Sequence, residues 1–61
     1  MRIIDIEGMV HHRTEKAILF SNDGIRANAV WLPLSMIEVE DTDSIYLVSL
    51  PEHLALEKGL I

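Results

Sequence analysis

Apolar and polar residues alternate along the first segment of the chain, residues 2–13. Isoleucines at positions 4 and 6 alternate with carboxylates at positions 5 and 7, and this period of two predicts a β-strand with one buried face. Gly8 interrupts the alternation and predicts a bulge or bend of the kind that small barrels use. We therefore expect one long, bent strand at the N-terminus.

Shorter apolar runs follow, and polar or Gly- and Pro-containing breaks separate them. The break at Ser21-Asn-Asp-Gly24 is a hairpin turn signal, because these residues tolerate positive φ. Pro33 removes a donor from any sheet, so residues 33–37 predict a tight connector with one 3₁₀ turn. The breaks at residues 14–15 and 41–44 predict turns. The expected strands cover residues 17–20, 26–32, 38–40 and 45–48.

The last thirteen residues, 49–61, predict a helix at about 50–58. Ser49 is the expected N-cap, Glu52 completes a capping box, and Pro51 lies in the first turn. Lys58 suits the negative end of the helix dipole, and Gly59 suits the left-handed residue that ends a helix.

The apolar residues of this helix predict its orientation. Leu54, together with Ala55 or Leu56, is expected to face the sheet. Leu60 and Ile61 are expected to seal the edge of the sheet or to reach a neighbouring chain. The predicted fold is one small β-rich domain over residues 1–61. It has four or five antiparallel strands in a curled, SH3-like or OB-like meander or small barrel, covered by one C-terminal helix.

Composition changes this picture in one respect. The chain has 61 residues, no cysteine and 49% hydrophobic residues. A domain of this length buries only about 60% of the surface that its unfolded chain exposes. Disulfides and thiolate metal sites are excluded, and the absence of cysteine fits a reducing cytoplasm. The apolar excess therefore predicts a homo-oligomer or a protein partner.

Charge is distributed unevenly. Residues 1–37 contain equal numbers of acidic and basic residues, whereas residues 38–57 contain six acidic residues and no Lys or Arg. Such a surface repels phosphate, so direct nucleic-acid binding is disfavoured. The apolar runs are too short to span a bilayer and the N-terminus lacks a signal peptide, so we expect a cytoplasmic protein.

Four groups of residues could carry chemistry. His11, His12 and His53 suggest a metal site, but neighbouring residues on a strand point to opposite faces, so we expect no metal and leave the roles of these histidines open. Glu38 and Glu40 share a strand face, yet a domain this small offers little pocket for catalysis, and the expected role is a charged edge. No cofactor and no catalytic residue are predicted.

Trp31 and Tyr46 could stack on a nucleotide or base. Without a basic groove, packing in the core or in an oligomer interface is the preferred interpretation for them and for Phe20. The acidic run from Glu38 to Asp43 either mimics the phosphates of a nucleic acid on a basic partner or is a solvated turn.

Three segments form a recognisable pattern. They are Lys16-Ala-Ile-Leu-Phe20, Val30-Trp-Leu-Pro-Leu-Ser-Met-Ile-Glu38 and Leu50-Pro-Glu-His-Leu-Ala-Leu-Glu-Lys-Gly-Leu60. The pattern resembles a group of short, mostly uncharacterised phage and prophage proteins. In these proteins a strand ends in Trp-Leu-Pro-x-Ser-x-Ile and the chain closes with Pro-Glu-Trp-Leu-Ala-x-x-Lys-Gly-Leu. His53 stands where that pattern has Trp. The resemblance implies a phage or mobile-element origin and a cytosolic, non-enzymatic accessory role.

The function expected on these grounds is protein binding, as a homo-oligomer or as an inhibitor of a host complex, including a defence complex. The expected apolar contacts are Trp31, Leu34, Met36 and Ile37. The expected charged rim comprises Glu38, Glu40, Asp41 and Asp43. Two alternatives remain open: an oligomer that binds a small ligand such as a nucleotide and, with less support, a single-stranded nucleic-acid binder.

Overall fold

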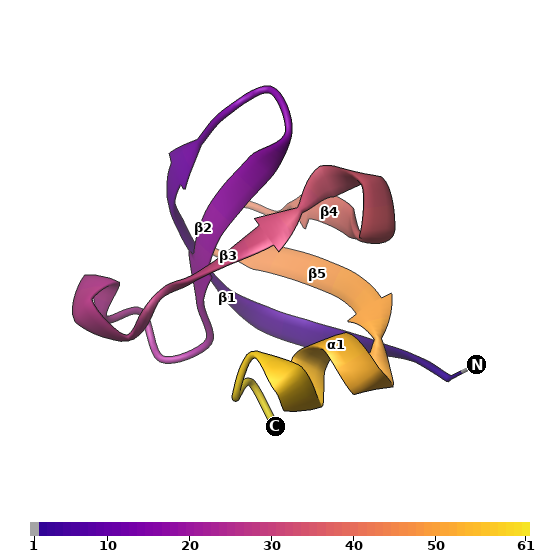
Figure 1. Ribbon diagram of the computed structural model, residues 1–61. Coiled ribbons are helices and arrows are strands. Elements are labelled where there is room, and N and C mark those ends of the chain that lie inside the picture. Colours follow the sequence, from indigo (N-terminus) through magenta and orange to yellow (C-terminus); the bar gives the residue numbers. More distant parts are fainter. Residues whose placement is uncertain (1) are drawn as a thin grey trace.

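A computed structural model describes residues 2–61, which form a five-stranded antiparallel sheet and one short C-terminal helix (Figure 1). The strands are β1 (Ile3–Arg13), β2 (Ala17–Ser21), β3 (Val30–Pro33), β4 (Glu38–Asp41) and β5 (Tyr46–Pro51). The helices are the 3₁₀ helices η1 (Arg26–Asn28) and η2 (Leu34–Met36) and the α-helix α1 (Glu52–Glu57). The predicted fold class is confirmed, as is the 3₁₀ turn after Pro33.

The strands lie in the order β3-β2-β1-β5-β4, so the long first strand is the centre of the sheet. Residues 3–8 of β1 pair with β5, and residues 9–13 pair with β2. This divides the sheet into two parts, which we name the β4–β5 half-sheet and the β2–β3 half-sheet. The sheet curls (Figure 1). Strands β3 and β4 are its two edge strands and do not pair with each other in the described chain, so the sheet does not close into a barrel.

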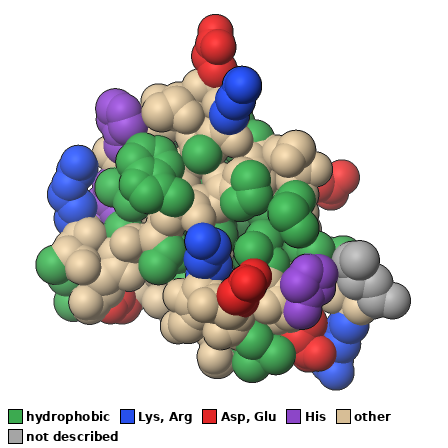
Figure 2. Space-filling model, viewed as in Figure 1, with side chains coloured by type: hydrophobic (Ala, Val, Ile, Leu, Met, Phe, Trp, Pro, Cys, Tyr) green, Lys and Arg blue, Asp and Glu red, His purple; other side chains and the backbone are tan. Residues whose placement is uncertain are grey.

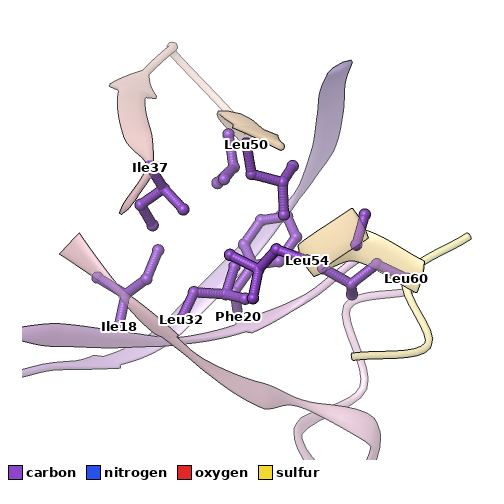
Figure 3. Close-up of a cluster of buried hydrophobic side chains, with 9 residues drawn as sticks. Ile18, Phe20, Leu32, Ile37, Leu50, Leu54 and Leu60 are labelled. Atoms are coloured by element: carbon purple, nitrogen blue, oxygen red, sulfur yellow. The ribbon is translucent and has the colours of Figure 1, made fainter. Parts of the chain in front are cut away.

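The inner faces of both half-sheets share one core (Figure 3). Ile18, Phe20 and Leu32 come from the β2–β3 half-sheet, and Val48 and Leu50 come from β5; all five are almost completely buried. Ile37, Leu54, Ala55 and Leu60 complete the cluster. Each buried Val, Leu, Ile or Phe side chain of this cluster stabilises the fold by about 1.5–3 kcal/mol, because its apolar surface is removed from water.

Gly8 lies where β1 leaves β5 and joins β2. A Cβ at this position would overlap the carbonyl oxygen of Ser21 and lie 2.6 Å from Cζ of Phe20. Glycine is therefore required by close packing of two strands. The predicted bulge occurs elsewhere: the register between β1 and β2 shifts between Val10 and His12.

The N-terminal end of α1 differs from the prediction. Ser49 lies inside β5, and no side-chain hydrogen bond caps the helix at Pro51. Pairing with β1 and β4 holds the backbone extended up to Pro51, so the capping box does not form. Instead, the backbone N–H of Glu52 donates to the carbonyl of Arg2, and the two side chains form an ion pair at 3.6 Å.

The C-terminal end of α1 agrees with the prediction. Gly59 has φ of 74°, its N–H donates to the carbonyl of Leu56, and the N–H of Leu60 donates to the carbonyl of Ala55. These two bonds are the Schellman motif, in which a left-handed residue closes the helix. Leu54 and Ala55 face the core as expected, Leu60 is buried with them, and Leu56 and Ile61 are exposed.

The connection between β2 and β3 is longer than the predicted hairpin. Residues 26–28 form η1, so the third strand begins at Val30 rather than at Arg26. Among residues 22–24 only Gly24 has positive φ. Oδ1 of Asp23 accepts a hydrogen bond from the N–H of Ile25, and Oδ2 accepts one from Asn28. These bonds make the loop a folded unit instead of a two-residue turn.

Candidate protein-binding surface

The outer face of the β4–β5 half-sheet carries two rows of aligned side chains. The strand register places Asp5, Ser49 and Glu38 in one row. It places Glu7, Leu47 and Glu40 in the next row on the same face. Between the two lies the row of Ile6, Val48 and Val39, which points inward, since Val48 is fully buried. We refer to Asp5, Glu7, Glu38 and Glu40, with Leu47 and Ser49 between them, as the acidic face.

The carboxylates of the acidic face have no basic partner within residues 2–61. The single salt bridge among these residues joins Arg2 to Glu52, outside this face. One carboxylate is engaged by a neutral group: the hydroxyl of Ser49 donates to Oδ1 of Asp5 at 2.6 Å. Four formal negative charges therefore lie together on one side of a sheet, where like charges repel one another.

A groove follows the edge strand β4 on this side. It consists of two open depressions of about 400 Å³ each, which share Glu38 and Ser49. The first is apolar at one end, where Ile3 and Met36 are 57% and 46% exposed beside Ile37. The second extends along β4 past Val39, Glu40 and Leu47. We refer to the two together as the β4 groove.

Ile3 and Met36 expose apolar surface beside the carboxylates. Exposed apolar surface with a polar rim is typical of interaction surfaces. The two ends of the β4 groove differ in chemistry: Ile3 and Met36 offer apolar contact, and Glu40 with its neighbours offers negative charge. A partner that fits the groove must therefore combine an apolar group with positive charge.

The structure brings some of the predicted partner-binding residues together and separates others. Met36, Glu38 and Glu40 line the β4 groove. Ile37 borders the first depression, but it is only 9% exposed and most of its side chain packs in the core between η2 and β4. Leu34 is half-buried against the same core.

The remaining two predicted residues lie at the end of β4. Asp41 is the last residue of this strand, and Asp43 is exposed in the turn that follows. Hydrogen bonds from the N–H and the hydroxyl of Thr42 to the carbonyl of Ile45 close this turn.

Trp31 lies apart from the β4 groove, on the outer face of the β2–β3 half-sheet. The register aligns it with Leu19 and His12, and its ring meets that of His12 edge-on at 6.0 Å and 88°. Trp31 is 45% exposed, and Figure 2 shows apolar side chains over the part of the molecule around β3. Tyr46 lies on β5 of the other half-sheet and Phe20 lies in the core, so the aromatic residues do not form one stacking platform.

The three histidines occupy separate places. Nε2 of His11 lies 2.7 Å from Oγ of the buried Ser21, His12 contacts Trp31, and His53 is exposed on α1. Among residues 2–61 no three His, Asp or Glu side chains are arranged to hold a metal ion. None of the helices in this part of the chain is long and apolar enough to cross a membrane.

Asp23 is a carboxylate with a perturbed pKa, and it lies outside the acidic face. The hydrogen bond from the N–H of Ile25 and the bond from the Asn28 side chain lower its pKa below the ordinary value of 3.8. Both bonds favour the charged form. Its role is to hold the β2–β3 loop.

The sequence alone did not reveal Ile3, Asp5, Glu7, Leu47 and Ser49 as members of this surface. Alternation predicted that residues 5 and 7 point outward, but their neighbours come from strands more than thirty residues further along the chain. Only the register of β1 with β5 joins them to Glu38 and Glu40.

Comparisons with known proteins returned no match, either to a family of proteins, to a curated protein or to a solved structure. The resemblance to short phage proteins therefore stays a prediction.

Proposed function

We propose that this chain is a non-enzymatic accessory protein of a phage or prophage that works by binding another protein through the β4 groove and the acidic face. Inhibition of a host complex, including a defence complex, is the most concrete form of this function. The observation that supports it is the group of four outward carboxylates without a basic partner, beside an open edge strand.

The position of these carboxylates in the sheet is informative. Charged residues on an edge strand prevent unwanted pairing with other sheets, which accounts for Glu38 and Glu40 on β4. Asp5 and Glu7 lie in the part of β1 that pairs with β5 and has no strand on its other side, so their charges also lie beside an open edge. The four carboxylates repel one another across one face, and a basic surface on a partner would remove that repulsion.

Binding of a nucleotide by an oligomer is the less favoured alternative. Carboxylates border both depressions of the β4 groove, and they repel the phosphates of such a ligand. The same repulsion disfavours direct binding of single-stranded nucleic acid.

Site-specific crosslinking tests the proposed function. A photoreactive residue is placed at position 36 or 40, in the groove, and at position 57 on α1 as a control. The proteins are then irradiated in host-cell lysate at low salt, and the products are identified by mass spectrometry. We expect the same host polypeptide at positions 36 and 40 in stoichiometric amount, and not at position 57. Absence of any such product at both groove positions would contradict the proposal.

A further inference from the structure

We infer that the partner supplies an extended, basic segment that adds to β4 as a further strand of the sheet and places alternate Lys or Arg side chains on the acidic face. This inference rests on the proposed function and specifies the occupant of the β4 groove. It follows from the edge of the sheet, from the spacing of the carboxylates and from the apolar end of the groove.

The two edges of the sheet differ in their capacity to accept another strand. Strand β4 pairs only with β5, so its other side presents backbone N–H and C=O groups without a strand partner. Strand β3 ends in Pro33, which has no N–H to donate. Residues 38–41 contain no proline, so of these two edge strands β4 is the one suited to strand addition.

The carboxylates are spaced as a strand requires. Glu38 and Glu40 are two residues apart on β4, which is about 7 Å along a strand. A strand added at about 4.8 Å from β4 would place one residue in the row of Asp5, Ser49 and Glu38 and another in the row of Glu7, Leu47 and Glu40. These two residues of the added strand would be two positions apart. Lys or Arg at alternate positions of that strand would therefore lie beside Glu38 and Glu40, the nearest members of the two rows. Asp5 and Glu7 lie on β1, about 14 Å from the added strand, and add attraction at longer range when the ionic strength is low. Within residues 2–61 no cation of this chain pairs with these four carboxylates.

The next outward position along the sheet is apolar. The row beyond Asp5 contains Ile3, paired with Pro51, and Met36 lies beside it in the first depression. An apolar residue two positions from the basic pair would enter this end of the groove. The occupant thus has the pattern apolar-x-basic-x-basic, in a segment without proline.

A palindromic peptide tests the inference, since it presents the same pattern in either strand direction. The probe is Leu-Thr-Arg-Thr-Arg-Thr-Leu with blocked termini. One control, Leu-Thr-Arg-Arg-Thr-Thr-Leu, keeps the composition and charge but loses the alternation. Binding is measured by calorimetry at low ionic strength, and hydrogen exchange of backbone amides locates the site. We expect the alternating peptide to bind about tenfold more tightly than the control and to slow exchange in β4 but not in β3.

Protein variants with equal changes of charge provide the second arm. We expect the double substitution Glu38→Lys and Glu40→Lys to weaken binding of the alternating peptide by about tenfold. The pair Glu15→Lys and Glu57→Lys, at exposed positions outside the face, changes the net charge equally and should leave the affinity almost unaltered. Substitution of Glu38 and Glu40 by Gln gives the same test with smaller disturbance of the fold, which thermal unfolding monitors.

Two results would overturn the inference. One is equal affinity for the alternating and the control peptide, which would mean attraction by net charge alone. The other is protection of amides outside β4. In either case the proposed function is retained if a host polypeptide still crosslinks at positions 36 and 40. Absence of that crosslink would contradict the proposed function as well.

Discussion

The two half-sheets share one core but present different outer faces. The β4–β5 half-sheet carries four carboxylates around Leu47 and Ser49. The β2–β3 half-sheet carries Trp31, Leu19 and His12 in the corresponding outward row. The inner rows of both are apolar and buried. The inner faces form the shared core and account for stability, whereas the outer faces are free to differ in chemistry.

Two features join the half-sheets into one domain. At Gly8 the strand β1 passes from one half-sheet to the other, and the absence of a side chain allows close contact with Ser21 and Phe20. At the C-terminus, Leu60 enters the core and its carbonyl accepts a hydrogen bond from Nδ2 of Asn22 in the β2–β3 loop. The helix that follows β5 is thereby fastened to the other half-sheet.

Removal of residues 59–61 should have the largest effect on the connection between the half-sheets. It deletes the buried Leu60 and the closing bonds of α1, so we expect the free energy of unfolding to fall by about 3 kcal/mol. Denaturant unfolding measures this loss, and light scattering detects any change of association. Deletion of Ile61 alone, which is exposed, is the matched control and should have little effect. If the two truncated proteins are equally stable, the C-terminal tail does not fasten the half-sheets.

Gly8→Ala should have the next largest effect. The added methyl group meets a backbone oxygen that cannot move without disturbing β2, so we expect a loss of about 2 kcal/mol or more. Gly59→Ala is the comparison: it meets no neighbouring atom, and only the left-handed backbone opposes it, at about 1 kcal/mol. Thermal unfolding of both variants gives the order of the two losses. The reverse order would mean that β1 and β2 can separate at Gly8 and relieve the contact with the carbonyl oxygen of Ser21.

Glu40→Lys should change stability by a smaller amount and in the opposite direction. It replaces repulsion within the acidic face by attraction, so we expect a gain of a few tenths of a kcal/mol at low salt that disappears at high salt. Glu15→Lys, in the turn between the basic residues Arg13 and Lys16, should give no gain. Chemical unfolding at two ionic strengths distinguishes these outcomes. An equal gain in both variants would attribute the effect to net charge and not to the acidic face.

The smallest expected effect concerns the pKa of Asp23 in the β2–β3 loop. Two hydrogen bonds lower this pKa in the folded state, so the stabilisation is present above the ordinary pKa of the carboxyl and is lost as the pH falls through the lowered value. Asn28→Ala removes one bond and should raise the pKa toward its ordinary value. Carbon-detected NMR titration of the carboxyl measures the shift. An unchanged pKa in the variant would mean that the bond from Asn28 does not contribute.

Much of the local structure could be predicted from the sequence. Alternation identified β1, the break at Pro33 identified η2, and the Lys-Gly pair identified the end of α1. Each of these signals depends on residues within a few positions of one another. The predictions for Ser49 and for the start of β3 were wrong, because pairing with distant strands decides whether a segment is extended.

The candidate site was predictable only in part. Glu38, Glu40 and Met36 were identified as a possible contact surface from their order in the chain, whereas Ile37 turned inward and Trp31 lay on the other half-sheet. The remaining members, from β1 and β5, could not be identified, because strand register does not follow from the sequence of either strand alone.

Local patterns in the chain account for the alternation of each strand, the closure of α1 at Gly59 and the uneven distribution of acidic residues. Strand pairing, by contrast, arises only in the folded chain, and it places Asp5 and Glu7 on one face with Glu38 and Glu40. The register is set by burial of the inward row of Ile6, Val48 and Val39. Once that apolar row is aligned, the period of two carries the charged residues to the same outer surface.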